Sequence, residues 1–268
     1  MRVRALAIAA ACGVAVWGLW RTFVASWPGQ QVERIALDGA VRWPVGEHVL
    51  DVVSVGFVAG AIVLAVVLAA LRRRWAIAGQ AVLLVAGANL TTRILKQGVL
   101  DRPRLGDDPP YANTLPSGHT TAAASVCAAL LLVAPARARP AVAVVGVFWT
   151  ALTGGSTLAG QWHRPSDVVA ALMVVLGWAA LAGALHPQEE PGPAPRGTRT
   201  AVWALVTVGV TTGAAAAGAL GIVWSVRDDP TSAAELIGHV GGMCAAVAAS
   251  AFGFVAMFLL RRGLDDGS

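Results

Sequence analysis

Residues 163–186 read HRPSDVVAALMVVLGWAALAGALH, and this stretch decides the fold. After Asp167, residues 168–185 contain no charged side chain. A run of this length is close to the roughly 20 apolar residues that a helix needs to cross the hydrocarbon core of a bilayer. The stretch therefore predicts a transmembrane helix with a polar first turn.

The composition of the whole chain agrees with this prediction. Of its 268 residues, 56% are hydrophobic and 13% are charged, about half the charged share of an average soluble domain. A chain with so much apolar and so little charged surface is neither disordered nor a typical soluble enzyme. Eight apolar segments can be marked, at 5–26, 49–71, 76–95, 119–134, 140–158, 167–186, 201–224 and 235–260. We expect an all-α, polytopic bundle of transmembrane helices.

The basic residues indicate how the bundle is oriented. The net charge is +5, but the arginines form short clusters between apolar segments, which is typical of orientation signals and not of nucleic-acid binding. One side, which holds both termini, carries eleven basic residues: Arg2, Arg4, Arg72, Arg73, Arg74, Arg137, Arg139, Arg196, Arg199, Arg261 and Arg262. The other side carries nine: Arg21, Arg34, Arg42, Arg93, Lys96, Arg102, Arg104, Arg164 and Arg227. We therefore expect both termini to be cytoplasmic and the loops 27–48, 96–118, 159–166 and 225–234 to face outside.

The stretch 187–200 is rich in Pro and Gly, which is typical of a linker. It predicts a division into a six-helix core at 1–186, a cytoplasmic linker at 187–200 and two additional transmembrane helices at 201–268. Nearly all the unusual polar residues lie in the core, so we interpret the last two helices as an appendage.

Three polar clusters fall in the outside loops or at the helix ends beside them: the first at 96–104, the second at 116–119 and the third at 156–167. The second of them, at 116–119, reads PSGH and opens an apolar segment. Free backbone N–H groups and the helix dipole make such a helix start an anion site. Gly118 allows a phosphate oxygen to approach closely, and His119 is placed to exchange a proton. The alternative is that Ser117 is an N-cap and His119 an interfacial side chain.

The third cluster places His163 four residues before Asp167. A carboxylate bonded to one ring nitrogen fixes the histidine tautomer and leaves the other nitrogen as a nucleophile. A salt-bridged pair at the membrane interface would explain the spacing equally well. The first cluster, with Lys96 and Arg102, supplies positive charge for phosphate oxygens, although either side chain could instead reach for lipid headgroups.

The order and spacing of the three clusters resemble the type 2 phosphatidic acid phosphatase (PAP2) superfamily, which includes acid phosphatases and vanadium haloperoxidases. The family pattern is Lys…Arg-Pro, then Pro-Ser-Gly-His, then Ser-Arg, five residues, His, three residues and Asp. The matching residues are Lys96, Arg102 and Pro103, then Pro116, Ser117, Gly118 and His119, then Ser156, His163 and Asp167. The resemblance covers the six-helix core at about residues 50–186.

The chain departs from the family pattern in two places. The gap between Lys96 and Arg102 is one residue shorter than usual, and Thr157 stands where the family has the Arg that follows Ser. That Arg neutralises phosphate, so its replacement affects rate or substrate. Arg164 or Arg104 lies close enough in sequence to compensate.

The resemblance implies a phosphatase that needs neither a metal ion nor a cofactor. His163 attacks phosphorus, His119 acts as acid and then base, and Asp167 orients His163. The phosphate is held by Lys96, Arg102, Ser117, Gly118 and Ser156. The expected protein is a lipid phosphatase of a bacterial plasma membrane, with its site at the outer face and prenyl or glycerolipid phosphates as substrates. Two alternatives stay open: a non-catalytic lipid-phosphate binder or cell-envelope scaffold, and a phosphotransferase that uses the same phosphohistidine.

Overall fold

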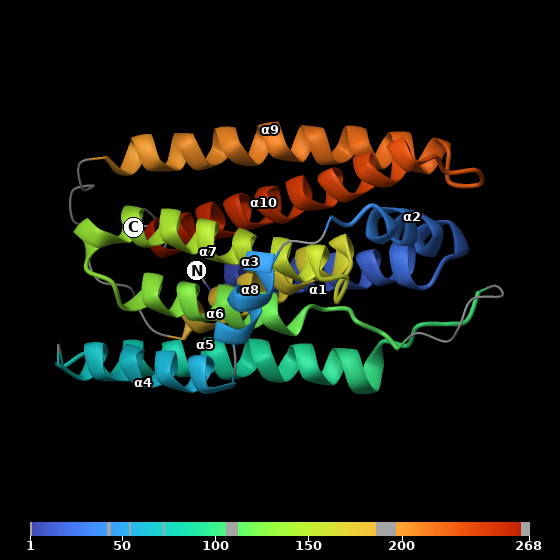
Figure 1. Ribbon diagram of the computed structural model, residues 1–268. Coiled ribbons are helices and arrows are strands. Elements are labelled where there is room, and N and C mark those ends of the chain that lie inside the picture. Colours follow the sequence, from blue (N-terminus) through green and yellow to red (C-terminus); the bar gives the residue numbers. More distant parts are fainter. Residues whose placement is uncertain are drawn as a thin grey trace.

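The computed structural model describes residues 2–41, 44–53, 55–71, 73–105, 112–185 and 197–263. Every regular element within these ranges is a helix, which confirms the predicted all-α class (Figure 1). The N-terminal half comprises α1 (Arg2–Leu19), the π-helix η1 (Trp20–Val24), α2 (Trp27–Asp38), α3 (Pro44–Val52), α4 (Val55–Leu71), α5 (Trp75–Ile94) and the π-helix η2 (Leu95–Val99). The C-terminal half comprises α6 (Gly118–Val133), the 3₁₀-helix η3 (Ala136–Ala138), α7 (Arg139–Ala159), α8 (Pro165–Ala184), α9 (Thr198–Ser225) and α10 (Ser232–Gly263).

Six helical segments within the described residues are long and apolar enough to cross a membrane, as a multi-pass membrane protein requires. They are Val3–Val24, Trp75–Val99, Ala136–Ala159, Pro165–Ala184, Thr198–Ser225 and Ser232–Arg261. Each coincides with one of the eight predicted segments.

The other two predicted segments differ from simple spans. The segment 119–134 forms α6, which has only 16 residues because its N-terminus starts inside the protein, where Leu115 and Ser117 are fully buried. Irregular backbone at membrane depth is tolerated where protein surrounds it. The segment 49–71 belongs to two helices, α3 and α4, and α3 carries the polar side chain of Asp51 within the predicted run.

The predicted outside loop 27–48 contains the helix α2, which the sequence prediction missed. Ser26 is its N-cap and accepts a hydrogen bond from Gly29 N (3.1 Å), and Pro28 occupies the first turn. Both residue types are favoured at these positions. The helix is amphipathic and buries Val32 and Ile35 on its inner face.

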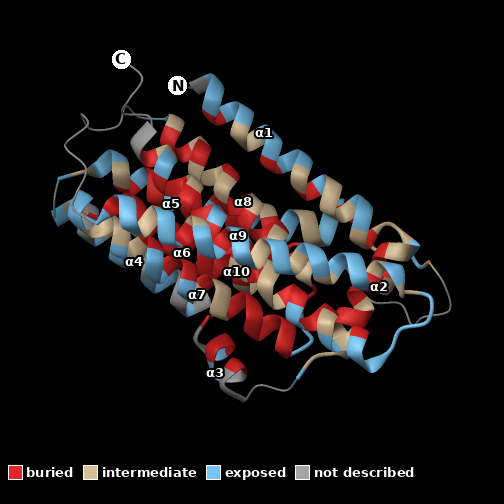
Figure 2. Cartoon of the chain, turned by 90° about the horizontal axis from the view of Figure 1, so that it is seen from above, coloured by how far each residue is buried: buried red, intermediate tan, exposed pale blue. Residues whose placement is uncertain are grey.

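The core lies along α5, α6, α8 and α10, whose inner faces are buried in Figure 2. Phe254 of α10 is fully buried and sits where Gly146 of α7 leaves room, since a Cβ at Gly146 would lie 2.4 Å from the ring. The interpretation of the last two helices as an appendage is therefore wrong for α10, because small residues let it enter the core. By contrast, α9 exposes much of its length (Figure 2). Most of the predicted linker, at 187–196, lies outside the described residues, as do 264–268.

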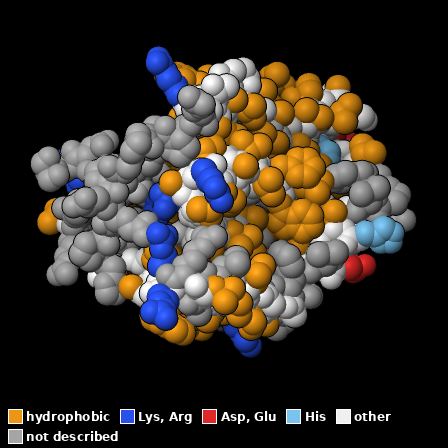
Figure 3. All heavy atoms as spheres, turned by 90° about the vertical axis from the view of Figure 1, so that its left-hand side faces the viewer, with side chains coloured by type: hydrophobic (Ala, Val, Ile, Leu, Met, Phe, Trp, Pro, Cys, Tyr) orange, Lys and Arg blue, Asp and Glu red, His pale blue; other side chains and the backbone are white. Residues whose placement is uncertain are grey.

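The end of the bundle opposite α2 carries the α4–α5 and α6–α7 connections and the start of α9 (Figure 1). Figure 3 views this end and shows several Lys and Arg side chains on it. The side chains of Arg2, Arg72, Arg196 and Arg262, which belong to the predicted cytoplasmic set, lie outside the described residues.

Candidate active site

The turn between α7 and α8 places His163 directly before the first turn of α8. The backbone N–H groups of Trp162 and His163 both donate to the carbonyl oxygen of Thr157, at 3.0 and 3.2 Å. Gln161 takes up a left-handed conformation (φ 58°) that reverses the chain. Pro165 then starts α8, as its fixed φ and missing N–H favour.

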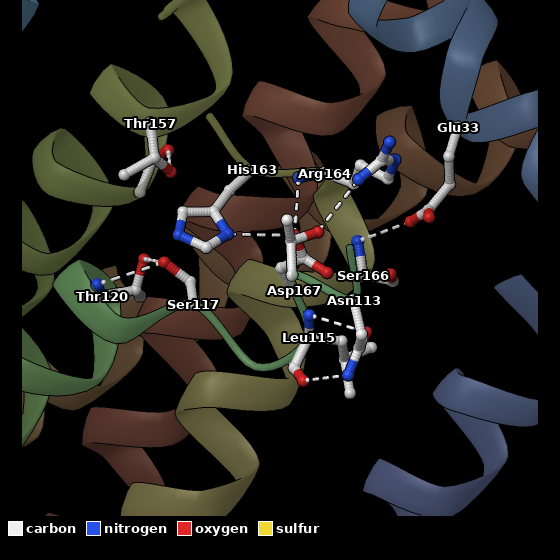
Figure 4. Close-up of polar contacts among 12 residues, drawn as sticks. Glu33, Asn113, Leu115, Ser117, Thr120, Thr157, His163, Arg164, Ser166 and Asp167 are labelled. Carbon is white, nitrogen blue, oxygen red and sulfur yellow. Dashed lines mark hydrogen bonds and ion pairs between the residues drawn. The ribbon is translucent and has the colours of Figure 1, made fainter. Parts of the chain in front are cut away.

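His163 and Asp167 form the contact that the sequence predicts. The Nδ1 atom of His163 lies 3.0 Å from Oδ2 of Asp167, and both side chains are buried (Figure 4). The same Oδ2 accepts a hydrogen bond from the backbone N–H of Arg164 (2.9 Å). The helix N-terminus favours the ionised carboxylate, which holds the proton on Nδ1 and leaves Nε2 on the far side of the ring as a nucleophile.

The start of α6 is fastened to this turn. The backbone N–H of Ser117 donates to the carbonyl oxygen of Asp167 (2.9 Å), and its hydroxyl caps α6 by accepting from Thr120 N (3.3 Å). A Cβ at Gly118 would meet no described atom within 4 Å, so the space beside its backbone is open. The predicted roles of Ser117 and Gly118 in binding phosphate are compatible with this geometry and stay predictions.

His119 faces His163 across a gap. Their ring centroids are 6.4 Å apart, and the ring of Trp162 lies 5.6 Å from that of His119. The two histidines are too far apart for a direct hydrogen bond, so a group that contacts both would have to lie between them.

The basic residues of the first cluster lie close enough to the other two clusters for their charges to act on them. Lys96 in η2 attracts the Asp167 carboxylate and disfavours a positive charge on His119. Arg102 is attracted by Asp167 and repelled by Arg164. Burial and then the neighbouring Arg164 guanidinium lower the pKa of Arg102. The structure therefore brings all three predicted clusters together.

Ser156 and Thr157 are buried at the end of α7, and both hydroxyl groups donate within their own helix. Ser156 bonds to the carbonyl oxygen of Leu152 (2.8 Å) and Thr157 to that of Gly154 (2.7 Å). In this arrangement neither hydroxyl has its hydrogen available for a phosphate oxygen, so the predicted phosphate contact of Ser156 would require its hydroxyl to rotate.

The two arginines considered as substitutes for the missing family Arg differ in position. Arg164 is buried at the site, and its Nη1 donates to Thr114 Oγ1 (2.9 Å). Arg104 is exposed. Figure 4 shows the Arg164 guanidinium on the side of Asp167 that faces away from the His163 ring. To reach a phosphate at His163, the Arg164 side chain would have to leave Thr114.

The contribution of α2 to the site was not predicted. Glu33 is 2% exposed, and one of its carboxylate oxygens accepts a hydrogen bond from Ser166 N (3.1 Å) in the first turn of α8. Burial, and next the neighbouring Asp167, raise the pKa of Glu33 to about 7. Gln30 donates to the carbonyl oxygen of Pro103 (3.0 Å), and Gln161 donates to that of Leu37 (2.8 Å). The amphipathic pattern of 27–38 could have predicted a helix, but no local signal shows that Glu33 is buried against α8.

Asn113 was also missed, and it shapes the loop before α6. Its Nδ2 donates to the carbonyl oxygens of Leu100 (2.7 Å) and Leu115 (3.0 Å), and its Oδ1 accepts from Leu115 N (3.1 Å). Asn113 thereby joins the first cluster to the second.

Within the described residues, no group of three or more His, Cys, Asp or Glu side chains is placed to hold a metal ion.

Part of the chain matches a known protein family. Among curated proteins and among solved structures, none matches the chain significantly. Residues 78–190 match the sequence model of the PAP2 superfamily. This range contains both histidines, Asp167 and the basic residues of the first cluster. The predicted resemblance to the PAP2 superfamily is thereby confirmed over residues 78–190.

Proposed function

We propose that the protein is a membrane-embedded lipid phosphatase that hydrolyses a prenyl or glycerolipid phosphate through a phosphohistidine. The observation that carries the proposal is the pair of facing histidines, one of which is hydrogen-bonded through Nδ1 to a buried carboxylate. A binding protein has no need for a nucleophile oriented in this way. The PAP2-type match over residues 78–190 supports a phosphatase-type activity.

The reaction takes place in two steps. In the first, Nε2 of His163 attacks phosphorus, the bond from phosphorus to the lipid oxygen breaks, and His119 protonates that leaving oxygen. In the second, His119 removes a proton from water, the resulting hydroxide attacks phosphorus, and the N–P bond breaks to release phosphate. The net reaction converts a lipid phosphate and water into a lipid alcohol and inorganic phosphate.

The chain's own charges stabilise the transferring group. Lys96 and Arg102 offer positive charge to the phosphate oxygens, and the open space at Gly118 gives access to the backbone N–H groups at the start of α6. No divalent ion takes part in these steps, so we expect turnover to survive EDTA. Vanadate, which mimics phosphate in such sites, should inhibit.

An apolar groove supports a lipid substrate. It has a volume of about 340 Å³ and lies between α1, α8 and the joined α5 and η2. Its lining includes Trp17, Leu95, Val99, Leu100, Met173 and Trp178. Leu95 and Val99 flank Lys96 in sequence, so a chain in the groove would leave its phosphate near the basic cluster.

The proposed location is the outer face of a bacterial plasma membrane, with both termini cytoplasmic, on the strength of the arginine distribution. Cysteine labelling tests the orientation after Cys12, Cys127 and Cys244 are replaced by alanine. A cysteine at the exposed Ala112 should react with an impermeant thiol reagent in intact cells, whereas one at the exposed Arg199 should react only after lysis. The reverse pattern would place the site on the cytoplasmic side.

The activity is tested with purified protein and a panel of lipid phosphates, by measuring the phosphate released in the presence of EDTA. Release that disappears in His163→Ala supports the proposal. Binding without release on any substrate would favour a lipid-phosphate-binding protein. This alternative is suggested by Thr157, which stands where the family has an Arg. Transfer of the phosphoryl group to an added alcohol would identify a phosphotransferase.

A further inference from the structure

A second cavity lies behind the first turn of α8, on the side away from the histidines. It has a volume of about 260 Å³ and is lined by residues of α1, η1, α2, α8, α9 and α10. Its walls are apolar or small and include Phe23, Val32, Leu220, Val223, Gly241 and Ala245. The last two helices, for which the proposed phosphatase chemistry has no use, form a large part of it.

One end of this cavity carries two polar side chains with unsatisfied atoms. Glu33 and Ser166 both line it, and they are 2% and 4% exposed. One oxygen of Glu33 accepts from Ser166 N, and the Ser166 hydroxyl lies close enough to the Glu33 carboxyl group to favour its ionised form. Neither Glu33 Oε2 nor Ser166 Oγ, however, has a partner at hydrogen-bonding geometry in the part of the chain that the structure describes. Leaving a buried polar atom unpaired is unfavourable, so such atoms beside a cavity point to a ligand group that satisfies them.

The electrostatics of this end disfavour an anion. Glu33 and Asp167 are neighbouring carboxyl groups, and their mutual repulsion contributes to the raised pKa of Glu33. A phosphate group would add negative charge next to both. A hydroxyl group has one donor and two acceptor sites, so it can donate to Glu33 and accept from Ser166 without adding charge.

The cavity opens toward the lipid phase. Among its lining residues, Ala217 and Leu220 are exposed, and both belong to the membrane-spanning helix α9. Its volume is slightly below that of typical small-molecule pockets (about 300–1,000 Å³). It therefore has room for a head group and the first part of a chain, while the rest of the chain would extend into the bilayer.

We propose that this cavity is a binding site for a long-chain alcohol, whose hydroxyl group bonds to Glu33 and Ser166 and whose chain lies between α9 and α10. Figure 4 shows Glu33 and Ser166 on the opposite side of Asp167 from His163, so the site is distinct from the proposed phosphate site. The binding does not depend on the phosphatase activity. If that activity is also present, the alcohol that it releases belongs to the class that this cavity would bind.

Photolabelling in lipid vesicles tests the site. The full chain with His163→Ala, which cannot convert a phosphate into an alcohol, is reconstituted in phosphatidylcholine and exposed to hexadecanol that carries a diazirine on its chain. We expect labelled residues among the cavity walls of α9 and α10, and competition by unlabelled hexadecanol. Hexadecyl phosphate should compete at least about tenfold more weakly.

Cavity-filling variants give the matched control. Ala216 lines the cavity, whereas its neighbour Ala215 is exposed and does not. Ala216→Phe should reduce specific labelling at least about tenfold, and Ala215→Phe should leave it unchanged. Ala245→Leu fills the same space from α10 and should repeat the loss, while thermal unfolding of each variant shows that it is folded.

Glu33→Leu should weaken labelling as well, because it removes the polar partner and keeps the apolar wall. The proposal is overturned if the alcohol labels no residue of these walls. It is also overturned if hexadecyl phosphate competes as well as hexadecanol, or if folded Ala216→Phe and Ala245→Leu variants are labelled like the parent.

Discussion

A buried carboxyl group lies on each side of the first turn of α8, and the two groups differ in their hydrogen bonds. On one side, Oδ2 of Asp167 accepts hydrogen bonds from the His163 ring and from Arg164 N. On the other, Glu33 is bonded through one oxygen to Ser166 N, and its second oxygen has no partner within the described residues. The first arrangement orients the ring as the proposed proton and phosphoryl transfer requires. The second leaves hydrogen-bonding capacity for a group that comes from outside the chain.

The largest expected effect falls on the histidine side. His163→Ala removes the nucleophile, so turnover of every lipid phosphate should fall below detection, because no phosphoenzyme can form. His48→Ala, which alters an exposed histidine on α3, is the matched control and should behave like the wild type. Phosphate release by the folded His163→Ala variant at a rate near the wild type would rule out covalent catalysis at this residue.

Arg164 lies between the two sides and should give the next largest effect. If it takes over the charge of the missing family Arg, Arg164→Ala should lower kcat/KM by roughly 30- to 1,000-fold, equivalent to about 2–4 kcal/mol of transition-state stabilisation. Arg104→Ala should cost far less, because Arg104 is exposed. An unchanged kcat/KM in Arg164→Ala would show that Arg164 stays with Thr114 during the reaction.

Glu33 should make stability depend on pH. Its pKa rises from the usual 4.5 to about 7 through burial and next through Asp167, so between these values the folded chain binds more protons than the unfolded chain. The free energy of unfolding should therefore fall as pH rises from 4.5 to 7, by about 3 kcal/mol. In Glu33→Gln this part of the dependence should disappear.

Thermal unfolding of both proteins across this pH range measures the difference. The charged groups that act on Glu33 are Asp167 in the first turn of α8, Arg164 directly before that helix, and Arg102 in the loop that precedes α6. These groups are present in both the wild type and the variant, so the difference between the two stability curves reports the titration of Glu33. Parallel curves for the two proteins would mean that Glu33 titrates normally in the folded chain.

The smallest effect is expected at Thr157. Thr157→Val removes a hydroxyl that donates to Gly154 in its own helix, which should cost about 0.5–1.5 kcal/mol of stability and leave kcat/KM nearly unchanged. Steady-state kinetics beside a thermal unfolding curve separate the two quantities. A loss of activity comparable to that of Arg164→Ala would instead assign Thr157 a phosphate contact.

The histidine side could be predicted from sequence because its signals are local. His163 and Asp167 are four residues apart at a helix start, and Ser117 and Gly118 mark the start of another. Helix geometry alone then fixes how these groups point. The apolar segments likewise predicted six of the spans, since length and hydropathy are sufficient for a membrane helix.

The Glu33 side could not be predicted in this way. The contact between Glu33 and Ser166 joins residues 133 positions apart, and it depends on how α2 folds back over the bundle. The entry of α10 into the core depends on the fit of Phe254 against Gly146, which composition does not reveal. Packing of this kind is decided by shape at distant positions, so a single sequence shows only the small residues that permit it.

The proposed phosphoenzyme on His163 is tested most directly by an attempt to trap it in the His119→Ala variant. A substrate with a good leaving group, such as para-nitrophenyl phosphate labelled with ³²P, needs no acid for the first step, whereas hydrolysis still needs a base. We expect label to accumulate on the protein as an acid-labile, alkali-stable adduct at His163, and we expect the added His163→Ala substitution to abolish it. Label that persists in the double variant, or that is found on another residue, would contradict a covalent role for His163.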